Sequence, residues 1–321
     1  MNYIFGPVPS RRLGLSLGID PTVVSGPFTD DRHADSKVCN WNCAYCQLGR
    51  THCFTTARAR YYPPEAMFEE LQETLATDSA RNIDWITFVG SGEPTLSSDL
   101  GTMIRGVKSM TDIPVAVLTN GSLLSDIRVR EDLMSADAVL PTLDAGTEEL
   151  YRRINRPHPN YNFERIIRGM IAFRARYSGK LWIECMLIAG VNDDEASLHD
   201  IAAAMKRVAP DEIHLVLPDR PPAEPWVKPA DEDGILRART ILGGVARTVY
   251  PAEVEFERGA IQDPLEAAAA IIARHPMSNE ELARSLSLWG VSDTETAIRM
   301  FAESRRGISV ERHGKTFWRA P

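Results

Sequence analysis

The chain has 321 residues, of which 44% are hydrophobic and 25% charged, and its formal net charge is −8. This length and composition are typical of one large α/β domain with an appendage, and they exclude extensive disorder. No apolar run reaches the roughly 18 residues that a membrane span needs, and the N-terminus lacks a signal-peptide pattern. We therefore expect a soluble, cytoplasmic protein. The acidic charge argues against a generally basic, nucleic-acid-coating surface.

Up to about residue 258, short apolar runs alternate with amphipathic stretches. Most of the apolar runs end in Gly, Asn, Asp or Pro, as buried parallel strands do, and they predict strands over Leu15–Ile19, Trp85–Val89, Val115–Thr119, Ala138–Leu143, Leu181–Ile188 and Glu212–Leu217. The amphipathic stretches predict helices over Pro64–Ala76, Leu100–Ser109, Leu123–Ser135, Phe163–Tyr177, Glu195–Val208 and Asp231–Leu242. Six such units predict a parallel barrel or an open doubly wound sheet, with the active site at the carboxyl ends of the strands. The polar segment 21–37 is expected to be an insertion loop, either an ordinary surface loop or a flap beside the site.

The pattern changes after residue 264. Residues Leu265–Arg274 predict a helix, and Ser278 with Glu281 forms a capping signature ahead of a second one. A third helix is expected from Ser292 or Asp293 to Arg305, followed by a hairpin over Gly307–Trp318. We therefore predict two domains, 1–264 and a small winged-helix-like domain over 265–321.

Four of the five cysteines lie within fifteen residues, and Cys39, Cys43 and Cys46 have the spacing C-x3-C-x2-C. Clustered cysteines in a cytosolic chain indicate a metal or redox site. A structural zinc site would need a fourth ligand, usually from a second separated pair; Cys53 is available, but no such pair exists. Three thiolates in one loop suit three irons of a 4Fe–4S cluster and leave the fourth iron open. Cys53 is interpreted as unligated, with a fourth-ligand or auxiliary role left open.

This spacing, with Tyr45 before the last cysteine, resembles that of the radical S-adenosylmethionine (SAM) superfamily. The stretch Gly90-Ser91-Gly92-Glu93 resembles its Gly-Gly-Glu motif, and residues 118–121 and 142–145 resemble two further motifs. The stretches 5–12, 46–49, 154–159 and 220–226 resemble one branch, the proteins related to the wyosine-base (tRNA) synthases. The resemblance implies a partial (β/α)6 barrel of the radical SAM type, a 4Fe–4S cluster on Cys39, Cys43 and Cys46, and SAM as the second cofactor.

The same resemblance implies which residues surround SAM. Gly90, Ser91 and Gly92 would let a strand end approach the methionine amino group, with Glu93 beside it. Tyr45 would lie near the adenine, and the backbone around Asn192 would pass it. Asn120, Thr142 and Asp144 would meet the ribose or the methionine carboxylate, although Asn120 and Asp144 are equally typical of strand-end turns.

Three functions are compatible with these motifs. The first is a radical SAM enzyme that reductively cleaves SAM to a 5′-deoxyadenosyl radical and abstracts hydrogen from a peptide, a protein or a small molecule, with a flavodoxin or ferredoxin as reductant. The second is a tRNA-modifying enzyme of the same kind. The branch resemblance favours it, but residues 265–321 hold 8 basic against 7 acidic residues, too neutral a balance for a tRNA footprint. The third is a non-catalytic Fe–S sensor with a DNA-binding winged helix, which would have no reason to keep the SAM-binding set.

Overall fold

The structure is a computed structural model that describes residues 3–23, 37–250, 255–312 and 314–320. Most of the predicted insertion loop, residues 24–36, lies outside the described residues, so the choice between a surface loop and a flap stays open. Within these ranges, every helix is too short or too polar to span a bilayer.

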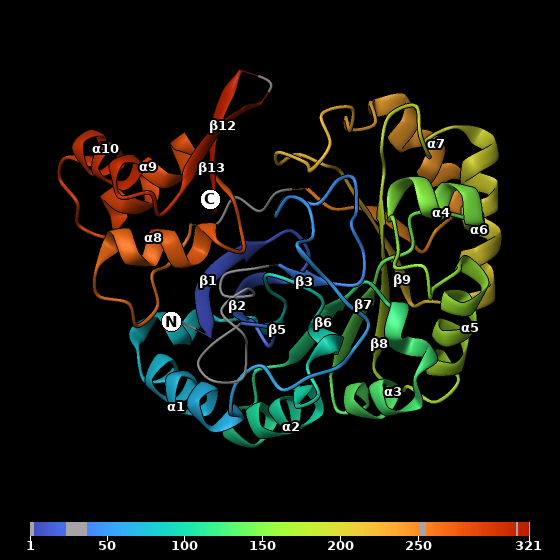
Figure 1. Cartoon of the computed structure of the whole chain (residues 1–321), viewed down its shortest axis with the longest axis horizontal. Helices are drawn as coiled ribbons and strands as arrows, with labels where there is room; N and C mark the ends of the chain where they lie inside the picture. Colours follow the sequence, from blue (N-terminus) through green and yellow to red (C-terminus); the bar gives the residue numbers. More distant parts are fainter. Residues whose placement is uncertain (1–2, 24–36, 251–254, 313, 321) are drawn as a thin grey trace.

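The central feature is an eight-stranded sheet with the strand order β1-β2-β5-β6-β7-β8-β9-β10 (Figure 1). Every neighbouring pair is parallel except β1 with β2. The strands are β1 Ile4–Ser10, β2 Gly14–Ile19, β5 Trp85–Phe88, β6 Val115–Thr119, β7 Ala138–Pro141, β8 Lys180–Met186, β9 Glu212–Val216 and β10 Ala246–Thr248. The α/β class and all six predicted parallel strands are confirmed. Two further short strands, β3 Val38–Cys39 and β4 Cys53–Phe54, pair with each other outside this sheet.

Helices cover the outer face of the sheet and follow it in an arc from α1 to α7 (Figure 1). They are α1 Pro64–Leu75, α2 Leu100–Met110, α3 Ile127–Leu133, α4 Glu148–Ile154, α5 Phe163–Arg174, α6 Glu195–Val208 and α7 Glu232–Leu242. The helix predicted over Leu123–Ser135 is split into a 3₁₀ turn, η4 Ser122–Ser125, and α3; two other 3₁₀ turns are η2 Asp78–Asn82 and η3 Pro94–Leu96. Asp126 ends the first turn and caps α3 by accepting a hydrogen bond from the Arg128 amide, which explains the break.

Strand β1 was not predicted, because Pro7 and Pro9 make its sequence look like a turn-rich start. Proline lacks the amide that a central strand needs, so within a sheet it is confined to edges and bulges. Strand β1 fulfils both conditions, since it is an edge strand and its register with β2 shifts between Phe5 and Val8.

The inner face of the curved sheet is filled at the amino ends of the strands. Leu13, Ala116, Ala138, Leu140 and Trp182 form a small buried cluster there. Apolar packing at this end leaves the open space at the carboxyl ends, where the polar strand-end residues gather.

The C-terminal unit (residues 264–319) lies beside β1 at the end of the helical arc (Figure 1). It contains α8 Pro264–Ile272, β11 Met277–Ser278, α9 Asn279–Leu288, α10 Thr294–Glu303, β12 Ile308–Arg312 and β13 Lys315–Arg319. The strands form a separate sheet of order β11-β13-β12, and Ser278 with Glu281 makes the predicted capping box of α9. The three helices and the hairpin were all expected; their assignment to a winged helix stays a prediction.

The core of this unit is shared with the first strand of the chain. Phe5 and Val8 of β1 are buried together with Ile271, Leu286 and Phe301 of the C-terminal unit. The predicted boundary at residue 264 is therefore crossed by apolar packing.

We expect Phe5→Ala to lower the free energy of unfolding by about 3–5 kcal/mol, because it empties a ring-sized space in this shared core. The Phe5 side chain is 4% exposed, and urea unfolding measures the change. Leu236→Ala, at a side chain 63% exposed on α7, is the control and should change stability by less than about 0.5 kcal/mol. Equal stabilities of the two variants would show that β1 does not contribute to the core.

Candidate functional site

The cysteine loop, residues 39–46, lies across the carboxyl ends of the strands and is held from outside by backbone hydrogen bonds. The Ala44 amide donates to the Ile154 carbonyl at the end of α4 (2.8 Å), and the Glu224 amide donates to the Ala44 carbonyl (3.0 Å). Trp41 is 2% exposed and its ring packs edge-on against Tyr151. These contacts fix the loop between α4 and the segment after β9.

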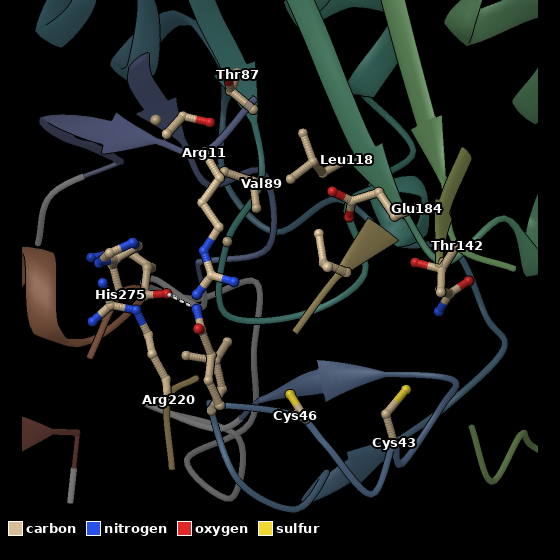
Figure 2. A pocket seen from close by; sticks show the side chains of 18 of the residues that line it. Arg11, Cys43, Cys46, Thr87, Val89, Leu118, Thr142, Glu184, Arg220 and His275 are labelled. Atoms are coloured by element: carbon tan, nitrogen blue, oxygen red, sulfur yellow. Dashed lines mark hydrogen bonds between the residues drawn. The ribbon is translucent and has the colours of Figure 1, made fainter. Parts of the chain in front are cut away.

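The loop forms one wall of a cavity of about 350 Å³. Cys39, Cys43 and Cys46 all line it, whereas Cys53 is not among the lining residues. Figure 2 shows Cys43 and Cys46 on one side, with Thr142, Glu184, Leu118 and Arg11 across the space from them. Of the other sequence-predicted site residues, Tyr45, Gly90, Gly92, Glu93, Asn120 and Thr142 also line this cavity, and Ser91, Asp144 and Asn192 do not.

The glycines of the Gly90–Glu93 stretch are required by contacts within the protein. A Cβ at Gly90 would lie 2.1 Å from the Asp20 carboxylate, and a Cβ at Gly92 would lie 1.9 Å from the Val38 carbonyl oxygen. Both glycines were predicted to allow close approach of a ligand. The structure shows that they first allow close approach of β2 and of the residue before Cys39.

Ser91 and Glu93 are likewise engaged by neighbouring chain segments. The Ser91 amide and hydroxyl both donate to Asp20 Oδ2, at 2.9 and 2.7 Å. Glu93 is 2% exposed and accepts hydrogen bonds from the Thr95 amide and hydroxyl, the Thr119 hydroxyl and the Asn120 amide. Burial raises the pKa of Glu93, and these four donors oppose the rise. The carboxylate thus ties the end of β5 to the end of β6.

Asn120 connects β6 to the cysteine loop. Its side-chain nitrogen Nδ2 donates to Asn40 Oδ1 at 2.7 Å and lies 3.8 Å from Cys39 Sγ, and its side-chain oxygen Oδ1 accepts from the Ser122 amide. Thr142 follows β7 and lines the cavity, with its amide donating to the Thr119 carbonyl. Both residues therefore lie at strand ends beside the cavity, and their contact with SAM stays a prediction.

Asp144 holds the loop after β7 together. It is 1% exposed and accepts hydrogen bonds from the Tyr45 hydroxyl (2.7 Å), the Asn155 amide (2.6 Å) and the Met186 backbone amide (2.7 Å). Burial raises the pKa of Asp144 to about 6 in spite of these donors. Its carboxylate thus receives three donors from the protein itself, and the contact with SAM that the resemblance implies stays a prediction.

Asn192 has a similar internal role. Its side chain accepts from the Ile188 amide and donates to the carbonyls of Asp144 and Met186, so it closes the turn after β8. The prediction for this position was that the backbone around Asn192 passes the adenine of SAM. The side-chain hydrogen bonds of Asn192 hold that backbone in a single conformation.

A protein-family comparison identifies residues 35–201, more than half of the chain, as matching the radical SAM superfamily. This range includes the cysteine loop and every candidate SAM residue. The chain belongs to the radical SAM superfamily. It is accordingly an enzyme, and its family uses a 4Fe–4S cluster and SAM.

Curated relatives of this radical SAM chain extend the match to its whole length. A UPF0026 protein of Methanocaldococcus jannaschii is 33% identical over 99% of this chain and 96% of the relative. A protein of Brachyspira hyodysenteriae named GTPase Obg is 39% identical over 74% of this chain but only 33% of its own length. Since the chain spans about a third of that second relative, the activity in its name is not transferred.

Solved radical SAM structures share the fold. TYW1 with a lysine–pyruvate adduct bound superimposes with a TM-score of 0.52 at 19% identity, covering 71% of this chain and 72% of TYW1. A radical SAM methyltransferase from Sphaerobacter thermophilus gives a TM-score of 0.55 at 17% identity, covering 73% of this chain and 66% of the methyltransferase. These likenesses support the partial-barrel architecture.

The cavity fits the cofactors of a radical SAM enzyme. Burial raises the pKa of Cys39 to about 11 and that of Cys43 well above its ordinary value, so these thiols ionise only beside strong positive charge. Iron ions supply such charge when thiolates bind them. The Lys37 ammonium donates to Cys46 Sγ at 3.0 Å and to the Gly49 carbonyl at 2.9 Å, a contact suited to a charged sulfur. Among the described residues, no three His, Cys, Asp or Glu side chains are placed to hold a single metal ion.

Several residues of the site were not predicted. Asp20, Lys37, Asn40 and Asn155 carry the hydrogen bonds that position the loop and the strand ends. Asp20 directly follows β2, which the sequence predicts as Leu15–Ile19, so the strand-end rule that selected Asn120 would also have selected it. No sequence pattern around Lys37 indicates its role, apart from its position close to Cys39 in the chain.

We expect Gly92→Ala to lower the iron content of the anaerobically reconstituted chain as well as its affinity for SAM. The added Cβ collides with backbone at Val38, so the cysteine loop must move. Iron per chain and SAM binding are measured together, with Gly244→Ala, whose Cβ would meet nothing within 4 Å, as control. Full iron content with SAM binding lost would instead restore a direct contact between Gly92 and SAM.

We expect Asp144→Asn to destabilise the fold by about 1–3 kcal/mol, because three donors face this carboxylate and an amide offers only one acceptor oxygen. Urea unfolding measures the loss. Asp112→Asn, at an exposed position, is the matched control and should leave the midpoint unchanged. A midpoint shared by wild type and Asp144→Asn would show that the carboxylate is not needed to hold this loop.

Proposed function

We propose that this chain cleaves SAM reductively and uses the resulting 5′-deoxyadenosyl radical to abstract a hydrogen atom from a substrate that is a small molecule or part of a peptide or protein. The observation that carries the proposal is the shared cavity: the three thiols of the C-x3-C-x2-C loop and the Gly90–Glu93 strand end line the same space of about 350 Å³. A cluster with one open iron, when bound there, supplies the electron that breaks the sulfonium carbon–sulfur bond.

In this proposal each residue has a separate task. Cys39, Cys43 and Cys46 would hold three irons, and Lys37 would stay hydrogen-bonded to the Cys46 sulfur. Gly92 and Glu93 would present the end of β5 to SAM, while Asn120 and Thr142 would contact it from the ends of β6 and β7. Asp144 and Asn192 would act indirectly, by fixing Tyr45 and the turn after β8.

The electron donor and the cellular location belong to the same proposal. The chain would receive its electron from a flavodoxin or ferredoxin in the cytoplasm, as the sequence predicts. A tRNA substrate is the less favoured alternative, because the C-terminal unit is nearly neutral and phosphate neutralisation drives nucleic-acid affinity. Membership of an enzyme superfamily argues against the sensor alternative.

The division into a barrel over 1–264 and a winged-helix-like domain over 265–321 is also a proposal. It is supported by the element order helix, strand, helix, helix, strand, strand and by the three-stranded sheet. The core that the unit shares with β1 means that the two parts would fold together.

The test is anaerobic reconstitution followed by reduction in the presence of SAM. We expect about four irons per chain and slow release of 5′-deoxyadenosine and methionine. Cys39→Ala, Cys43→Ala and Cys46→Ala should each abolish both signals, because each removes one of three ligands. Cys53→Ala, the matched control from the same segment, should keep the cluster absorbance. The assignment of the three cluster ligands would be contradicted if Cys53→Ala lost the cluster while one of the other three alanine variants kept it.

A further inference from the structure

One side of the cavity is unusually basic. Its lining includes four arginines and one lysine against the acidic side chains of Glu93, Glu184 and Asp219. The basic end, defined as Arg11, Arg12, Arg220, Arg274 and His275, is built from the β1–β2 turn, the segment after β9 and the end of α8. Figure 2 shows Arg11, Arg220 and His275 beside one another on the side of the cavity away from Thr142.

Two of these arginines pair with carboxylates that are buried or nearly so. Arg12 pairs with Glu184, whose side chain is 15% exposed. Arg274 pairs with Asp20, whose side chain is fully buried, at 3.1 Å. In each pair the carboxylate neutralises the guanidinium charge, because charges removed from water need a partner.

Arg11 and Arg220 are less well neutralised. Arg11 donates to the Leu217 carbonyl and pairs with Asp219 at 3.0 Å, and Arg220 reaches Glu281 only at 3.3 Å. Both partner carboxylates are 35% exposed, so water screens them, while the arginine side chains are only 17% and 12% exposed. Burial lowers the pKa of both guanidinium groups, and the charges of Arg220 and Arg12 lower that of Arg11 further. Each of the four arginines thus has a carboxylate partner, and the partners of Arg11 and Arg220 are the two that water screens most.

His275 adds an unused polar atom to the same place. Its Nδ1 is buried and has no hydrogen-bond partner among the described residues. Burial and the nearby Arg220, Arg11 and Arg12 hold the pKa of His275 well below its ordinary value, so the ring is neutral. A buried polar atom without a partner costs free energy that a bound ligand can recover.

We propose that the basic end binds an oxyanion of the substrate, a carboxylate or a phosphate, through Arg11, Arg220 and His275. Guanidinium groups present planar donor pairs that match either oxyanion, and a neutral imidazole adds one further hydrogen bond. Arg11, Arg220 and His275 come from different segments than the cysteine loop and the Gly90–Glu93 strand end, and the proposal assigns those two to SAM and the three basic residues to the substrate. The inference rests on the proposed function in taking the bound anion to be part of the substrate.

The test is calorimetric titration of the reconstituted full-length chain, under nitrogen and without reductant, with inorganic phosphate and with acetate. Acetamide, which has the shape of acetate but no charge, is the control ligand. We expect saturable binding of at least one anion and none of acetamide. Binding of phosphate alone indicates a phosphate-bearing substrate, and binding of acetate alone indicates a carboxylate-bearing one.

Variants locate the site. Arg11→Gln and Arg220→Gln should each weaken the anion about tenfold or more, because a hydrogen bond to a charged group contributes roughly 1.5–3 kcal/mol, and His275→Gln should weaken it less. Arg299→Gln, at an exposed position on α10, is the matched control and should bind as the wild type does. If a glutamine variant unfolds, the lysine variant at the same position keeps the charge but loses the planar fork, and a smaller loss is expected.

Three results would overturn the inference: no binding of either anion, binding unchanged in all the cavity variants, or displacement of the bound anion by SAM in direct competition. The last result would assign the basic end to SAM itself. The binding measurement needs no turnover, so anion binding by a chain that fails to cleave SAM would contradict the proposed function alone.

Discussion

The buried carboxylate of Asp20 organises the carboxyl edge of the sheet. It accepts hydrogen bonds from Thr22, from the amide and hydroxyl of Ser91, and from Arg274 of the C-terminal unit. Because the carboxylate occupies the space in which a Cβ of residue 90 would lie, that residue must be glycine. One charge therefore fixes where β5 ends, and Glu93 repeats the arrangement one strand further along.

The strands were predictable because parallel strands buried on both faces are short apolar runs, and each of the six has such a sequence. The cysteines and Gly90–Glu93 were predictable because their chemistry or conformation shows in local spacing. Asp20 and Arg274 are 254 positions apart, and no local pattern indicates a pair formed over such a distance. The same holds for His275, which follows α8 and reaches the cavity only because the C-terminal unit packs on β1.

Asp144 and Asn192 follow β7 and β8, and their side chains have partners within the protein, while their predicted places around SAM stay predictions. Strand-end polar residues face either a ligand or their own turn, and composition alone does not distinguish the two. Here Asp144 receives three internal donors and Asn192 closes a turn, whereas Asn120 and Thr142 face the cavity. Asp144 has internal partners because the Met186 amide and the Asn155 side chain, which come from other segments of the chain, donate hydrogen bonds to it.

The packing of β1 against the C-terminal unit joins the first residues of the chain to the last. During synthesis β1 leaves the ribosome before the C-terminal unit, so Phe5 and Val8 meet Ile271, Leu286 and Phe301 only after residues 264–319 have followed. Throughout that interval an edge strand with apolar side chains is exposed to other chains. Pro7 and Pro9 lie in this strand, and proline at an edge removes the amides that a foreign strand would need for pairing. The two prolines that make β1 hard to recognise in the sequence thus also remove two amides that such pairing would use.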